Sequence, residues 1–171
     1  MKTISGLTGA HKGEVLTVIG RGPSLTRLQP EHLDGVVMAI NHAIEQVESL
    51  QPSNPLYSLQ KDHLYMLPVR ATLLLHELEA LTEINSVKYE PTYSFDAERD
   101  FNVRWNVPSV VVAEKFANWF GCKRVIYLCC DAATDGITEA YGQPATKPVA
   151  YLEHQRLVLE NATLPVEWKR I

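Results

Sequence analysis

Short apolar runs separated by longer segments with helical spacing are the feature that most limits the fold of this chain. Each run is continuously apolar rather than strictly alternating, which is typical of strands covered on both faces. The run ATLLLHELEAL, which starts at 71, also has the i, i+4 spacing of a helix. The predicted strands lie at 14–20, 35–41, 55–61, 71–77, 86–91, 123–130 and 164–171.

Three helices are predicted between these runs, at 42–50, 108–121 and 148–161. In the second, Pro108 suits the first turn, Ser109 can cap it, and Gly121 suits the left-handed C-terminal position. Strand and helix in repetition predict one α/β domain over 1–171, Rossmann-like, with a mostly parallel sheet and helices on both faces. The segments 92–106 and 132–147 are expected to be irregular loops.

Composition indicates the general class of protein but does not indicate a function. The 171 residues carry a net charge of −4, which argues against nucleic acid as a partner. No apolar run approaches the roughly 18 residues of a membrane span. The three cysteines, Cys122, Cys129 and Cys130, form neither a disulfide framework nor a zinc motif. These features favour a cytoplasmic protein.

Polar residues follow each clear strand. Because the carboxyl ends of parallel strands meet at one edge of a sheet, where ligands bind, we expect these residues to lie together. They are Gly20, Arg21, Gly22, Pro23 and Ser24 after the first strand, Asn41 and His42 after the second, Lys61, Asp62 and His63 after the third, and Asp131, Asp135 and Gly136 after the run at 123–130, with Ser109 at a helix start.

The turn after the first strand combines properties that suit an anion. Two glycines let the backbone approach a phosphate, Arg21 can pair with it, and Ser24 offers a hydroxyl. The alternative is an ordinary tight turn in which Ser24 caps the next segment.

The other candidates also have two interpretations each. Asn41 can bind a base or ribose edge, or simply end its strand as a turn former. Asp62 and Asp131 can hold a ribose hydroxyl or a cation, or cap the turns that follow them. His154 can act as a base, or lie on the surface of its helix.

Several familiar sites are missing from the sequence. There is no HExxH, no Cys-x-x-Cys pair and no Asp-x-Asp, so no metal ligands are assigned. A P-loop is excluded because no Lys-Ser/Thr pair follows the glycines, and the third glycine position of GxGxxG is Leu25. Ordinary ATPase and NAD-dehydrogenase sites are therefore disfavoured.

The motifs together resemble one superfamily. VIGRGPSL is similar to the GxGPSL loop of the bacterial lipo-oligosaccharide sialyltransferases and of the archaeal 6-hydroxymethylpterin diphosphokinase and motility-accessory-factor group. MAINHA, YSLQKD and PSVVVAEKFANWFGCKRVIYLCCDAATDG resemble later motifs of the same proteins. The resemblance covers 15–62 and 108–136.

The resemblance implies a role for each matching residue. Gly20 to Ser24 would hold the donor phosphate, Asn41 the ribose or base, and Ser109 would lie under the nucleotide. The loop through Asp135 and Gly136 would close over the ligand, and His154 would serve as general base. The chain departs from the family in having Arg21 where sialyltransferases have Asn, and in lacking their lid subdomain.

The leading hypothesis is a small glycosyltransferase-like enzyme that uses a nucleotide-activated donor, with Arg21 stabilising charge on the leaving phosphate. One alternative is a module that binds the nucleotide without chemistry. Another is a diphosphokinase-like enzyme that uses ATP and Mg²⁺, with Asp62 and Asp131 near the metal. The sequence carries no signal for the donor base, the acceptor or the oligomeric state.

Overall fold

The computed structural model describes residues 1–61, 64–77, 92–130 and 150–171. The described strands are β1 (Lys2–Thr3), β2 (Val15–Ile19), β3 (Val36–Ile40), β4 (Leu56–Gln60), β5 (Thr72–His76), β6 (Thr92–Phe95), β7 (Arg124–Leu128) and β8 (Val166–Trp168). The helices are α1 (Ala43–Ser49), α3 (Ala97–Phe101), α4 (Ser109–Phe120) and α5 (Ala150–Asn161), with 3₁₀ turns η1 (Ile4–Leu7), η2 (Pro23–Arg27) and η3 (Pro30–His32).

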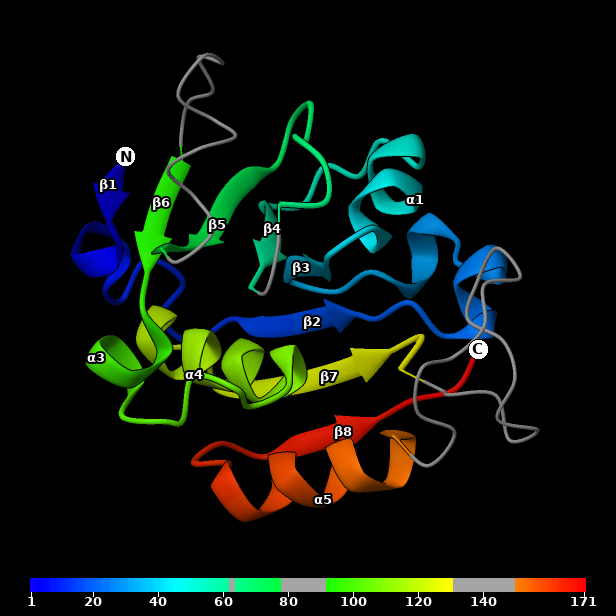
Figure 1. The fold of residues 1–171 in the computed structure, drawn as a ribbon. Coiled ribbons are helices and arrows are strands. Elements are labelled where there is room, and N and C mark those ends of the chain that lie inside the picture. Colours follow the sequence, from blue (N-terminus) through cyan, green and yellow to red (C-terminus); the bar gives the residue numbers. More distant parts are fainter. Residues whose placement is uncertain (62–63, 78–91, 131–149) are drawn as a thin grey trace.

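All eight strands form one sheet in the order β1-β6-β5-β4-β3-β2-β7-β8, and every pairing is parallel. From β2 the chain adds strands on one side as far as β6, then returns so that β7 pairs with the other side of β2. The arrows of β2, β7 and β8 point the same way in Figure 1. This is a Rossmann-like α/β fold, as the alternation of runs and helices predicts.

Alternate residues of each strand bury opposite faces of the sheet. Leu16, Val18 and Tyr127 pack in a core with α4, while Ile19 and Leu128 pack in a second core with α1 and η2. Both faces are therefore covered, and this explains why the strands read as continuous apolar runs.

Helix α4 begins and ends close to its predicted bounds. Pro108 is the N-cap and Ser109 the first helical residue, so the prediction that Ser109 is the cap is wrong by one position. Gly121 takes the left-handed conformation, with φ 78°. Val111 and Val112 are poor helix formers, but both are completely buried in the core beneath α4, which offsets their low propensity.

The segment 92–106 differs from the predicted irregular loop. It contains β6, which pairs with β5, and the short helix α3. Asp96 caps α3 by accepting hydrogen bonds from the amides of Glu98 and Arg99, which lowers the pKa of its carboxyl. The run at 71–77 forms strand β5 rather than a helix.

Two other predictions, the strand at 86–91 and the irregular segment at 132–147, lie outside the described residues. In the described parts of the chain, no helix has both the length and the apolar character that crossing a membrane requires.

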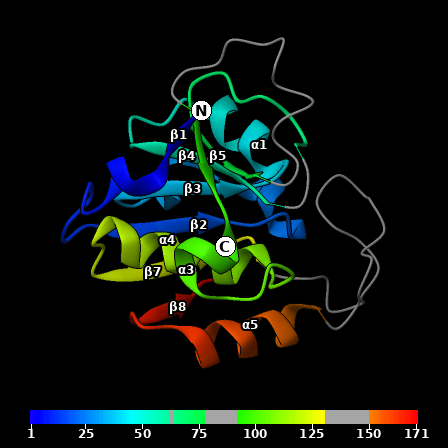
Figure 2. The ribbon, with the colours of Figure 1, turned by 60° about the vertical axis from the view of Figure 1, so that its left-hand side comes forward.

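A buried carboxylate fastens the last helix and strand to the rest of the fold. Glu114 of α4 is 1% exposed and accepts hydrogen bonds from the Thr163 amide (2.8 Å), the Thr163 hydroxyl (3.1 Å) and the Leu164 amide (3.2 Å). Lys115 donates to the carbonyl of Asn161 at the end of α5. Figure 2 shows α5 beside β8, at the end of the sheet away from α1.

The substitution Glu114→Ala should lower the free energy of unfolding by about 3 kcal/mol, because two amides and a hydroxyl lose a buried acceptor. Glu114→Gln keeps one acceptor oxygen and should cost about 1 kcal/mol. Urea unfolding followed by circular dichroism measures both losses. Equal losses for the two variants would contradict the bonding role of this carboxylate.

Candidate functional site

The strand order reverses between β2 and β7, one strand in from the β8 end of the sheet. In open parallel sheets such a reversal leaves room for a ligand beyond the carboxyl ends of the two strands. The turn that begins at Gly20 follows β2, Asn41 follows β3, and Cys129 follows β7. The carboxyl edge near β2 and β7 is therefore the candidate site.

The turn after β2 is held directly against the end of β7. The Gly20 amide donates to the Leu128 carbonyl (2.9 Å), and the Gly22 amide donates to the Cys129 carbonyl (2.6 Å). A Cβ at Gly20 would lie 2.7 Å from both the Cys129 oxygen and the Cys130 sulfur. The close approach to β7 therefore requires glycine at position 20. The amides of Gly20 and Gly22 are hydrogen-bonded to the end of β7 and do not point toward a ligand.

The side chain of Arg21 is fixed by an imidazole and an aromatic ring. One guanidinium nitrogen lies 2.7 Å from Nδ1 of His42, and the guanidinium carbon lies 5.8 Å from the centre of the Tyr65 ring. The rings of His42 and Tyr65 pack edge to face at 4.6 Å. Since a guanidinium can only donate, Nδ1 of His42 accepts this bond, and a neutral His42 carries its proton on Nε2.

Gln60, at the end of β4, determines where Tyr65 lies. Its buried side chain accepts from the amides of Tyr65 (2.7 Å) and Met66 (3.2 Å) and donates to the Met66 carbonyl (2.6 Å). The carboxamide thereby pins the segment that carries Tyr65 to the sheet. The sequence prediction missed both residues. The one available signal was a glutamine inside an apolar run, PLYSLQK.

Asn41 turns the chain from β3 into α1. Its backbone is left-handed, with φ 52°, and its amide donates to the Leu59 carbonyl (2.9 Å). Asparagine tolerates this conformation, so the turn-forming interpretation has a structural basis. In addition, its side-chain oxygen Oδ1 is buried and has no hydrogen-bond donor in the described part of the chain. A ligand amide or hydroxyl at this position would satisfy it.

Two more polar residues at this edge are buried in the interior. Lys61 follows β4 directly and is 1% exposed, and Ser24 in η2 is also 1% exposed. Lysine is rarely buried to this extent. Ser24 lies inside η2 with its neighbour Leu25 rather than on the surface of the turn, while Pro23 begins η2.

Ser109 lies at the same edge of the sheet, at the start of α4. The Tyr127 hydroxyl of β7 donates to the Val110 carbonyl (2.6 Å), which ties the first turn of α4 to β7. Burial raises the pKa of Tyr127 well above its usual value, so this donor keeps its proton. Trp168 of β8 stacks on Tyr127, with ring centres 4.3 Å apart. Ser109 is therefore anchored beside the end of β7.

The remaining predicted residues divide into two groups. His154 lies in the second turn of α5 and is half-buried. The other five, Asp62, His63, Asp131, Asp135 and Gly136, lie outside the described residues. Within the described residues, no cluster of three or more histidine, cysteine or acidic side chains is arranged to hold a metal ion.

No protein-family model and no curated protein matches this chain. The resemblance to sialyltransferases and diphosphokinases therefore stays an expectation based on short motifs. What the fold itself contributes is the contact of Gly20 and Gly22 with the end of β7 and the bond between Arg21 and His42.

The substitution Gly20→Ala should destabilise the protein by about 2 kcal/mol, because the new methyl group would force β2 and β7 apart. Gly6→Ala is the matched control, since a Cβ there would meet only Tyr93 at 3.8 Å, and its stability should change by less than about 1 kcal/mol. Chemical denaturation compares the two. A Gly20→Ala protein as stable as the control would contradict the close packing of this turn.

Proposed function

We propose that the chain binds a nucleotide or nucleotide-activated donor at the carboxyl edge of β2 and β7 and acts as a small transferase. The observation that carries the proposal is the position of Arg21. The reversal of strand order brings a fixed guanidinium to the edge of the sheet where parallel α/β proteins bind their ligands. A phosphate is the anion that such a planar donor binds best.

The Arg21 guanidinium is held in place before any ligand binds. His42 and Tyr65 hold Arg21, and Gln60 in turn holds Tyr65, so the guanidinium loses little conformational freedom when an anion binds. Because the Gly20 and Gly22 amides donate to β7, the proposal relies on side chains of the turn for the phosphate contact, with Asn41 bonding the sugar or base.

Isothermal titration calorimetry with CMP, CDP, UDP, GDP and ATP, each with and without Mg²⁺, tests binding. At least one nucleotide should bind, and Arg21→Ala should weaken it about ten-fold or more, because a charge-assisted bond to phosphate is lost. Arg124→Ala is the matched control, since this arginine lies at the opposite end of β7 in an exposed pair with Glu167 (3.3 Å). Absence of heat from every nucleotide at millimolar concentration would end the proposal.

His154 distinguishes an enzyme from a module that only binds. In a transferase it would accept the proton of the acceptor hydroxyl as that oxygen attacks the donor and the nucleotide leaves. His154→Ala should then lower transfer of a labelled donor about 100-fold while leaving nucleotide affinity unchanged. His32→Ala in η3 is the control. If the wild-type protein binds a nucleotide but transfers nothing to any acceptor, the binding module is the better description.

A further inference from the structure

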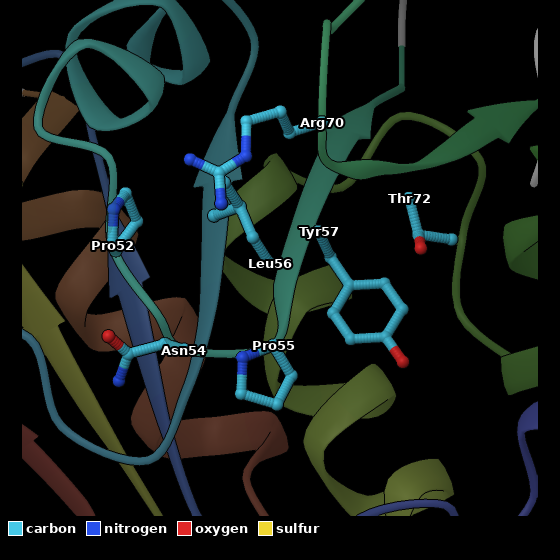
Figure 3. A pocket seen from close by; sticks show the side chains of 7 residues that line it. All are labelled: Pro52, Asn54, Pro55, Leu56, Tyr57, Arg70 and Thr72. Atoms are coloured by element: carbon cyan, nitrogen blue, oxygen red, sulfur yellow. The ribbon is translucent and has the colours of Figure 1, made fainter.

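A pocket of about 270 Å³ lies at the amino edge of the sheet, opposite the candidate site. It is formed by the loop between α1 and β4, the start of β4, and the start of β5. Its lining residues are Pro52, Asn54, Pro55, Leu56, Tyr57, Arg70 and Thr72. Figure 3 shows the side chain of Arg70 reaching from the β5 side toward Leu56 on β4.

Arg70, an exposed residue, brings a guanidinium to this pocket. In the part of the chain that the structure describes, no carboxylate pairs with its guanidinium. Glu48 of α1 binds the backbone of this segment and not the guanidinium: it accepts from the amides of Val69 (2.9 Å), Arg70 (2.8 Å) and Ala71 (2.9 Å). A protein with a net charge of −4 thus leaves this arginine without an internal partner.

The other lining groups add no negative charge and little flexibility. Burial raises the pKa of Tyr57 to about 12, so its phenol stays neutral, and its hydroxyl bonds Nε2 of His11 (2.8 Å). Asn54 is fixed by its bond to the Gly35 carbonyl (2.8 Å). The prolines at 52 and 55 restrict the loop, and Glu48 clamps the segment that carries Arg70. The walls are therefore formed before any ligand arrives.

We infer that this pocket binds a small monocarboxylate with a compact apolar body. The guanidinium of Arg70 would take the carboxylate in a bidentate bond. The apolar body would lie against Leu56 and Pro52, which are on the same side of β4 as the guanidinium (Figure 3). The volume is just below the roughly 300–1,000 Å³ typical of pockets for drug-sized ligands, which limits the ligand to a small acid.

This second site is independent of the proposed nucleotide site. Tyr57 and Thr72 start their strands, whereas the Gly20 turn, Asn41 and Lys61 follow the ends of theirs. A carboxylate bound here would contact neither Arg21 nor His42.

Benzoate and its neutral isostere benzamide are the probes. Titration of the ¹⁵N-labelled full chain should give saturable shifts of the Leu56, Tyr57 and Thr72 amides with benzoate, with a dissociation constant of about millimolar order. Benzamide should bind about ten-fold or more weakly, and so should benzoate to Arg70→Gln. Arg124→Gln, which removes a charge elsewhere on the amino edge, should bind benzoate as the wild type does.

Three results would overturn the inference: no saturable shift up to about 50 mM benzoate, equal shifts with benzamide, or unchanged affinity in Arg70→Gln. The spectrum of each variant reports whether it is folded, so a loss of binding through misfolding is recognised directly. Nucleotide calorimetry on Arg70→Gln separates the two sites, because it should match the wild type whatever benzoate does.

Discussion

The contact between the turn after β2 and the end of β7 is the constraint on which the rest of the carboxyl edge depends. The chain adds four strands outward from β2, β3 to β6, before it returns to β7, so nothing local in the sequence brings 20–22 to 128–130. Two amide–carbonyl hydrogen bonds hold these two segments together, and the absence of a side chain at Gly20 lets them approach. Cys129 adopts a left-handed backbone, with φ 54°, directly at this junction. A non-glycine residue in this region carries a conformational cost, which the surrounding contacts must offset.

This contact also changes the chemistry expected of the turn. A glycine-rich turn after a strand suggests backbone amides pointed at a phosphate. Here the amides of Gly20 and Gly22 complete the sheet, and the glycine at 20 is explained by packing against Cys129 and Cys130. In the proposed nucleotide site, the side chain of Arg21 would then be the main group that binds the phosphate.

The apolar runs made most of the fold predictable, because both faces of the sheet are buried and each central strand stands out from its neighbours. The segment 92–106 was missed for an equally physical reason. In β6 the aromatic residues Tyr93 and Phe95 alternate with Thr92 and Ser94, and α3 spans only five residues, stabilised by the Asp96 cap. Elements this short carry little periodicity. At the site, Tyr65 and Gln60 were missed because their roles depend on hydrogen bonds between a strand and the loop that follows it.

The two edges of the sheet hold their arginines in different ways. Arg21 at the carboxyl edge is positioned by side chains, His42 and Tyr65, whose own places depend on α1 and β4. Arg70 at the amino edge is positioned through its backbone, because Glu48 binds the amides of 69–71. Its guanidinium is not part of these bonds and lines the pocket. The same helix, α1, supplies Glu48 and follows His42 directly. A shift of α1 along the sheet would therefore disturb both edges, and the packing of Ile44 and Val47 against the core opposes such a shift.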